Sequence, residues 1–367
     1  NQTMSISSIR FNESDKPDFF RVLRKRVDNY FTENKVNKHA NVNMVIKTIF
    51  MLALYFSPLV LMLTGVVTSF GWSVVMWSIM GFGMSGIGLS IMHDANHGAY
   101  SANPNVNKAM GFVLNFIGGY HVNWKIQHNV LHHSFTNIQG YDEDIEKAGI
   151  IRFSPDQPKK KIFRFQLLYA PILYSILTLY WALFKDYEQL ISYHKRGLLK
   201  TQGVSFAQGL SRIILYKSIY FFTILVLPML VTDFAWYQIV LGFVIMQAIS
   251  GLILALVFQS AHVLEETDFF VPDENSNVEN SWAIHQMRTT SNFARGNVPL
   301  TWFIGGLNHQ VEHHLFPTIC HVHYPAIAHI VKETAEEFDV PYHEHKTFTG
   351  AIMSHFRMLR ALGAGTV

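Results

Sequence analysis

Two long stretches of the chain carry no charged side chain. Residues 48–92 and 234–261 contain no Asp, Glu, Lys or Arg, and both are mostly apolar. About 20 mostly apolar residues in a helix cross the hydrocarbon core of a bilayer. The first stretch is long enough for two transmembrane helices and the second for one. The pattern therefore predicts a protein embedded in a membrane.

Turn-forming residues divide the apolar stretches into hairpins. In the span 45–92 they gather at residues 68–71, which predicts two transmembrane helices joined by a turn. A second hairpin is expected from residues 212–232 and 234–261, because only a short turn near Asp233 separates them.

Three short segments are dense in histidine. They read HDANHG at 93–98, HNVLHH at 128–133 and HQVEHHLFP at 309–317. Imidazole is a good ligand for iron, zinc, copper or nickel. Three such segments beside membrane helices therefore indicate a metal site.

The spacing inside these segments suggests two metals. Residues four apart lie on one face of a helix, and the first two segments each hold such a pair. His133 directly follows His132 and points about 100° away from it, so such a doublet can serve two metals from one helix. The third segment repeats the doublet. The ligands expected from the three segments are His93, His97, His128, His132, His133, His313 and His314.

Other histidines and nearby acids fit the site to different degrees. His262, in FQSAHVLEE, lies at the end of the last predicted transmembrane helix and is expected to be a further ligand, whereas His285 is less favoured. Ligating histidines usually donate their second nitrogen to a carboxylate or carbonyl. The acids placed to accept such bonds, with ordinary solvated acids as the alternative, are Asp94, Asp142, Asp144 and Glu312. The histidines expected to be mostly structural are His39, His194, His321, His323, His329, His343, His345 and His355.

A shared metal centre constrains the topology, because its ligands must lie on one side of the membrane. Three apolar stretches separate the second and third histidine segments, and three crossings would put the third segment on the far side. Residues 163–184 are rich in Tyr, interrupted by Pro171 and flanked by basic residues, so they are expected to lie in the interface. Lys and Arg number eight in residues 1–44 and thirteen in 93–212, with none in the predicted turns. The positive-inside rule therefore places the histidines and both ends of the chain in the cytosol.

The fold expected from these patterns is an all-α integral membrane protein. Four transmembrane helices form two hairpins, and a cytosolic helical cap holds the metal site. The predicted parts are a cytosolic arm (1–44), a first hairpin (45–92), a cytosolic region with two histidine segments and an interfacial helix (93–211), a second hairpin (212–261) and a cytosolic region with the third histidine segment (262–367).

Composition narrows the function further. Charged residues make up 15% of the chain, against about 25% in an ordinary soluble domain. The net charge of +3 is modest, and no nucleic-acid partner is expected. The single cysteine, Cys320, excludes an intrachain disulfide and a metal site built from several cysteines.

The sequence resembles the membrane fatty acid desaturases from about residue 45 to 330. The resemblance rests on HDANHG, HNVLHHSFTN and GGLNHQVEHHLFP together with the two hairpins. In the third segment, Gln310 stands where many relatives have a histidine, and HHLFP follows, as in the front-end subgroup. The resemblance implies a non-haem di-iron centre that uses O2 and two electrons. It also implies a double bond inserted between an existing one and the carboxyl end of an acyl chain.

Carried over by position, the resemblance implies a set of metal ligands. At position 309, front-end relatives usually show an aromatic or another non-ligand residue, whereas this chain has a histidine. Because imidazole is a good ligand for iron, His309 is an alternative to Gln310. The implied ligands are His93, His97, His128, His132, His133, His262, Gln310, His313 and His314.

Partners follow from the same resemblance. The chain has no HPGG haem motif of a fused cytochrome b5 domain, so a separate donor such as a ferredoxin or cytochrome b5 is expected to supply electrons. The substrate is expected to be a fatty acyl group on coenzyme A, on acyl carrier protein or on a membrane lipid. The basic stretch Lys159–Arg164 could meet an acidic donor or an acyl carrier's phosphates, or it could be a plain positive-inside flank.

Three other kinds of membrane protein are alternatives. A membrane hydroxylase or ketolase shares the histidine segments and the di-iron chemistry. A metal transporter would need polar residues along an intramembrane path, yet residues 48–92 and 234–261 carry no charge. A zinc hydrolase would need only about three protein ligands.

Overall fold

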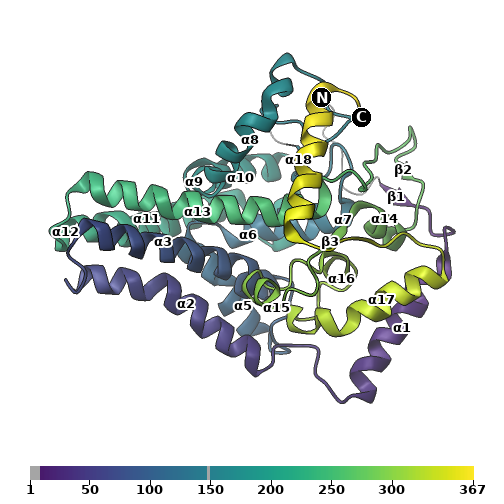
Figure 1. The fold of residues 1–367 in the computed structure, drawn as a ribbon, viewed down its shortest axis with the longest axis horizontal. Helices are drawn as coiled ribbons and strands as arrows, with labels where there is room; N and C mark the ends of the chain where they lie inside the picture. Colours follow the sequence, from purple (N-terminus) through teal and green to yellow (C-terminus); the bar gives the residue numbers. More distant parts are fainter. Residues whose placement is uncertain (1–8, 147–148) are drawn as a thin grey trace. The chain divides into compact units, whose positions relative to one another are not determined.

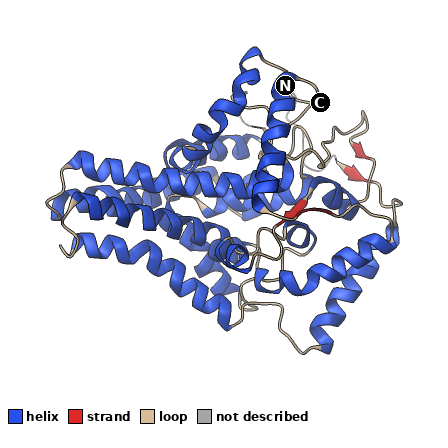
Figure 2. Cartoon of the chain, viewed as in Figure 1, coloured by secondary structure: helices blue, strands red, loops and turns tan. Residues whose placement is uncertain are grey.

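The structure, a computed structural model, describes residues 9–146 and 149–367 and is almost entirely helical (Figures 1 and 2). Residues 1–8 of the predicted arm and residues 147–148 of the predicted 93–211 region lie outside the described residues. The chain forms two compact units, each built from separate segments. The spanning unit comprises Asn41–Ile126 and Pro171–Leu256; the histidine-rich unit comprises the described residues of Asn1–Ala40, Gln127–Ala170 and Val257–Val367.

Four helical stretches are long and apolar enough to cross a membrane, which confirms the predicted pair of hairpins. Asn41 and Ser69 begin the first two stretches by accepting a hydrogen bond from a backbone N–H in the first turn. A further helical pair, Lys161–Ser175 and Leu177–Lys195, is bent by 58°. It is long and apolar enough to cross a membrane only if the two helices are counted as one span. It covers the segment predicted to lie in the interface. The four stretches are Val42–Leu63, Phe70–Asn96, Phe206–Val231 and Trp236–His262.

Small residues let the helices of the spanning unit approach closely. A Cβ added at Gly81 of α3 (Phe70–Gly86) would lie 2.9 Å from the carbonyl oxygen of Met246 in α13 (Trp236–His262). One added at Gly83 would lie 2.7 Å from the backbone nitrogen of Tyr55 in α2 (Val42–Leu63). Glycine is therefore required at both contacts, as the expected role of these residues in helix packing implies.

A buried ion pair lies within the spanning unit. The Lys217 ammonium in α11 (Phe206–Phe221) lies 2.8 Å from the Asp186 carboxylate at the start of α10 (Asp186–Lys195). Lys217 also donates to the backbone carbonyls of Gly118 and Trp181, at 2.9 and 3.1 Å. These contacts connect α11 to the segment that precedes the second histidine segment.

The histidine-rich unit packs short helices around an apolar core. Helix α1 (Pro17–Glu33) lies along α17 (Tyr324–Glu337) in Figure 1, and Leu23 and Val331 are buried between them. Two short parallel strand pairs complete the unit: β1 (Arg10–Phe11) with β2 (Asn277–Val278), and β3 (Ser291–Phe293) with β4 (His343–His345).

The remaining elements are shorter. Those of the spanning unit are η2 (Ile87–Ile91), α4 (Met92–Asn96), α5 (Pro104–Phe112), η3 (Val113–Ile117), α6 (His121–Lys125), α9 (Leu177–Tyr180), η6 (Trp181–Lys185), η7 (Leu198–Gln202), η8 (Phe222–Val226) and α12 (Leu227–Val231). Those that lie in or extend into the histidine-rich unit are η4 (Ile126–His132), α7 (His133–Phe135), η5 (Lys161–Phe165), α8 (Gln166–Ser175), α14 (Trp282–Thr289), α15 (Val298–Phe303), α16 (Gln310–Leu315), η9 (His321–His323) and α18 (Phe348–Ala364). The five-part division predicted from the sequence remains a prediction.

Candidate metal centre

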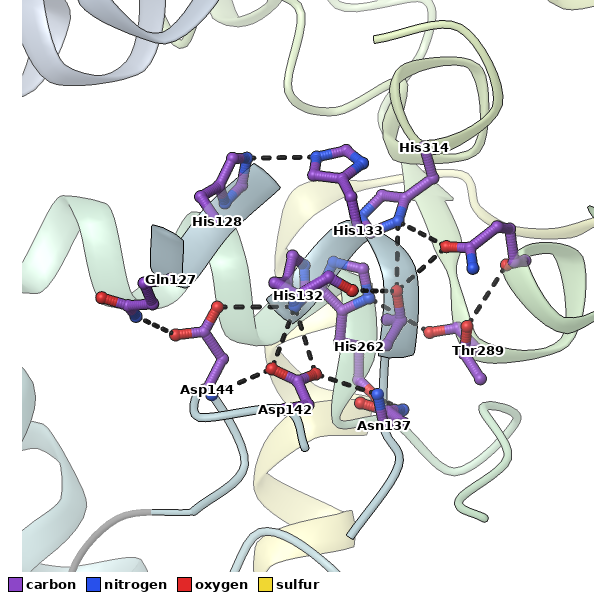
Figure 3. Close-up of polar contacts among 12 residues, drawn as sticks. Gln127, His128, His132, His133, Asn137, Asp142, Asp144, His262, Thr289 and His314 are labelled. Atoms are coloured by element: carbon purple, nitrogen blue, oxygen red, sulfur yellow. Dashed lines mark hydrogen bonds and ion pairs between the residues drawn. The ribbon is translucent and has the colours of Figure 1, made fainter. Parts of the chain in front are cut away.

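Three histidines from distant parts of the chain meet inside the histidine-rich unit (Figure 3). His132 ends η4, His262 ends α13 and His314 lies in α16. Each offers a ring nitrogen within 4.8 Å of those of the other two, and all three side chains are buried. Burying three imidazoles together is costly unless their nitrogens are satisfied, so the cluster indicates a bound ion.

The outer ring nitrogen of each of these histidines is already held by the protein. Nδ1 of His132 lies 3.1 Å from the Asp142 carboxylate. Nδ1 of His262 lies 3.1 Å from the carbonyl oxygen of Thr289, and Nδ1 of His314 lies 2.8 Å from Oε1 of Gln286. These acceptors fix the proton on Nδ1 and leave Nε2 with its lone pair. Nε2 of His262 is buried and has no hydrogen-bond partner among the described residues, as a metal-binding nitrogen would after the ion is removed.

A second set of imidazole nitrogens converges nearby in the same unit. Nε2 of His133 lies 3.2 Å from Nε2 of His128 and 2.9 Å from Nε2 of His313. Nδ1 of His313 contacts the Tyr324 hydroxyl at 3.1 Å, so its inner nitrogen is again the one turned toward the group. Three nitrogens that point at one another suit a shared cation.

The backbone around the second histidine segment is a π-helix rather than an α-helix. Residues of η4 bond five positions apart, so His128 and His133 come together with ring centroids 4.7 Å apart. His132 lies beside them and faces His262 and His314, at centroid distances of 4.7 and 5.0 Å. Single π-turns often occur at functional sites. Here the wider turn directs neighbouring histidines to different groups.

Helix α14 contacts three of the converging histidines. Thr289 and Gln286 hold His262 and His314, and the Trp282 indole N–H donates to the carbonyl of His133 at 3.1 Å. The sequence analysis did not find these contacts. His262 and Thr289 are 27 residues apart and His314 and Gln286 are 28 apart, and no spacing rule connects them.

The chain is similar to known proteins of one family over most of its length. The family model for fatty acid desaturases matches residues 31–346. The chain is 37% identical to the sn-1 linoleoyl-lipid 6-desaturase of Synechocystis sp., over 98% of this chain and 99% of that one. It is 35% identical to the acyl-lipid (8-3)-desaturase of Physcomitrium patens, over 97% and 74%, and 34% identical to the sn-1 linoleoyl-lipid 6-desaturase of Arthrospira platensis, over 98% and 96%.

The chain belongs to the fatty acid desaturase family. The resemblance to the fatty acid desaturases, including their front-end subgroup, is confirmed, and so is the predicted class of oxidoreductase, an acyl desaturase. Buried histidine clusters and several candidate membrane spans fit this family as well.

Two of the predicted carboxylates, Asp142 and Asp144, contact a histidine, whereas Glu312 contacts other side chains. Asp142 is fully buried and accepts from the Asn137 backbone N–H at 2.9 Å as well as facing His132. Asp144 lies 3.4 Å from Nδ1 of His132 and accepts from the Gln127 amide at 2.6 Å. Glu312 instead accepts from Asn292 and Tyr342, which places its hydrogen bonds away from histidine.

Gln310 and His309 are both buried but differ in surroundings. The amide nitrogen of Gln310 has no hydrogen-bond partner among the described residues. Nδ1 of His309 lies 3.3 Å from Oδ1 of Asn308. Burial, with Arg295 and His321 nearby, lowers the pKa of His309 to about 3, so its ring is neutral.

His285, the less favoured candidate, has a separate role. Its Nε2 donates to the carbonyl oxygen of Thr136 at 2.7 Å, and its ring packs on Phe270 at 4.7 Å. Burial lowers the pKa of His285 to about 4 despite the hydrogen bond to Thr136. It therefore fastens α14 to the end of the second histidine segment as a neutral donor.

His93 and His97 belong to the spanning unit. They end the helical stretch that begins at Phe70, and their rings lie 4.9 Å apart. Both pack on the Trp124 ring, at 5.6 and 5.8 Å. The side chain of His93 also approaches Asp94, with Nδ1 3.6 Å from Oδ1. The π-helix η2 precedes them, as η4 contains the second segment's histidines.

Proposed function

We propose that this protein is a front-end acyl-lipid desaturase with a di-iron centre. It would insert a cis double bond between an existing double bond and the carboxyl end of an acyl chain that is linked to a membrane lipid. The lipid-linked substrate is supported by the names of the Synechocystis and Physcomitrium relatives. The observation that carries the metal assignment is the convergence of imidazole Nε2 atoms whose Nδ1 atoms are already engaged.

The proposed ligands keep the set expected from the sequence. Six histidines of the histidine-rich unit are supported by their geometry. Gln310 is supported by its buried amide nitrogen, which has no hydrogen-bond partner among the described residues, since amide oxygen and nitrogen exchange by rotation. His93 and His97 are supported by their motif and by their packing on Trp124. The proposed ligands are His93, His97, His128, His132, His133, His262, Gln310, His313 and His314, and Asp94, Asp142 and Asp144 are proposed to orient the imidazoles.

The reaction removes two hydrogens from adjacent methylenes. In balance, the acyl chain, O2, two electrons and two protons give the unsaturated chain and two waters. Two irons bound here would, with O2, supply the oxidising power, since no side-chain base is strong enough to deprotonate a methylene. Neutral imidazoles would hold the metals, Asp142 fixes the ring of His132, and the apolar helices would hold the acyl chain away from water.

Orientation and electron supply complete the proposal. The distribution of Lys and Arg supports a cytosolic active site. A separate donor protein, such as a ferredoxin or cytochrome b5, would deliver the electrons.

Lipid profiling of a bacterial host tests this function. The host should make no polyunsaturated lipids, carry a ferredoxin or cytochrome b5 system and receive linoleate. We expect a new cis double bond on the carboxyl side of the existing ones, located by mass spectrometry of the intact lipids, and none with His132→Ala. A hydroxylated or keto product would instead assign the chain to the hydroxylases or ketolases.

A further inference from the structure

The side chain of Gln286, in α14, contacts both a histidine and a threonine. Its side chain is buried, and Oε1 lies 2.8 Å from Nδ1 of His314 and 2.9 Å from the Thr136 hydroxyl. The amide nitrogen has no hydrogen-bond partner among the described residues. One acceptor atom thus serves a histidine from the third segment and a threonine just after the second.

The position of one proton decides whether His314 can bind a metal. A neutral imidazole carries a single N–H, and only the other nitrogen has a lone pair to donate. An acceptor at Nδ1 holds the proton there and frees Nε2. An amide turned end for end would present its NH2 to Nδ1, move the proton to Nε2 and block that nitrogen.

Thr136 favours the productive orientation of the amide. Its hydroxyl lies 2.9 Å from Gln286 Oε1 and 2.8 Å from the carbonyl oxygen of His132, so it can donate to either acceptor. Donation to Oε1 stabilises the amide with its oxygen toward His314. The threonine, which follows the second histidine segment, thereby helps to orient the amide that contacts the ring of the third.

The hydrogen-bond partners of His132 and His314 differ in charge. Asp142 gives His132 a carboxylate partner, whereas His314 receives a neutral amide. A carboxylate makes an imidazole a stronger electron donor to its metal than an amide does. The neutral partner keeps one ligand of the centre less electron-rich.

We propose that Gln286 is a positioning residue that sets the tautomer and donor strength of His314. This rests on the proposed function only in that the histidines bind iron, because the role concerns metal binding and not the product formed. The structure supports it through two hydrogen bonds to one oxygen atom and the burial of all three partners.

Anaerobic Fe(II) titration of the purified full chain against a competing chelator tests the proposal. Gln286→Met keeps the length of the side chain but removes the acceptor, and we expect iron affinity to fall about 10- to 100-fold. Gln286→Glu restores an acceptor, and we expect near-normal affinity with a reduction potential below that of the wild type. Thr136→Val should lower the affinity less than Gln286→Met does.

Gln247→Met is the matched control, since it removes a buried glutamine of the spanning unit whose amide donates to Tyr220 at 2.8 Å. We expect it to leave the iron affinity unchanged. Wild-type affinity in Gln286→Met, or equal loss in the Met and Glu variants, would overturn the proposal. If Gln286→Met does not fold, a wild-type reduction potential in Gln286→Glu would overturn the proposal. Failure of the desaturase assignment would appear in the lipids and leave these iron measurements in place.

Discussion

The two units bury polar groups for different purposes. In the histidine-rich unit, Asp142, Gln286 and Thr289 each hold one ring nitrogen of a histidine. In the spanning unit, Lys217 pairs with Asp186 and also donates to two backbone carbonyls. The first arrangement turns the opposite ring nitrogens toward a shared centre, whereas the second fastens helices to one another. Buried polarity therefore indicates a metal site where several donor atoms converge.

Loss of a converging histidine should have the largest effect. His132→Ala and His313→Ala each remove an imidazole from a converging group, so we expect loss of bound metal and of all desaturation. The variants should still insert in the membrane. Metal analysis and lipid profiling of the purified and expressed protein measure this, and retained activity would remove that residue from the ligand set.

The third histidine segment offers a sharper comparison between neighbours. Gln310→Ala should lose most activity because it removes a proposed ligand. His309→Phe should keep most of it, because Nδ1 of His309 faces Asn308. If His309→Phe lowers the iron content instead, His309 is the ligand and the assignment of Gln310 fails.

Changing a brace should have a smaller effect than changing a ligand. Asp142→Asn keeps the shape but removes the negative charge facing His132, so we expect metal affinity to fall about 10- to 100-fold. Asp144→Asn should lower the affinity less, because its contact with Nδ1 of His132 is longer, 3.4 Å against 3.1 Å. Wild-type affinity in Asp142→Asn would show that the charge of Asp142 is not needed.

Breaking the ion pair of the spanning unit should change stability more than chemistry. Lys217→Met leaves Asp186 buried without its partner, and such a loss costs about 3–5 kcal/mol. We expect a lower thermal unfolding temperature with the metal content per folded chain unchanged. Removing both charges, Lys217→Met with Asp186→Leu, should recover much of the loss, and no recovery would show that the backbone contacts carry the stability.

The smallest effect on activity is expected at His355. Its Nδ1 contacts the carbonyl of Val263 at 2.8 Å, and burial lowers its pKa to about 4 from 6.5. The unfolded chain takes up this proton first, so the stability contribution is present above pH 6.5 and is lost as the pH falls toward 4. His355→Gln should keep activity and flatten the unfolding temperature over this range. A variant with the wild-type pH dependence would contradict this.

The helices could be predicted from the sequence because their cause is local. Charge-free runs and the turns between them give the hairpins directly, and Gly81 and Gly83 indicate close packing. The dense histidine segments likewise stand out within a few residues. What joins them is not local: the spacing of His128 and His132 assumed an α-helix, whereas the chain forms a π-helix that brings His133 to His128. The role of Gln286 depends on packing between α14 and α16 that no short pattern encodes.

The segmented make-up of the histidine-rich unit sets an order of events during synthesis. His132, His262 and His314 leave the ribosome in turn, and by the time His314 is made, all four membrane stretches have already been translated. A nascent chain therefore has no complete set of these three nitrogens to offer until its membrane insertion signals have been read. A metal held by all three of these histidines would therefore be bound only after the whole hairpin pair has been translated.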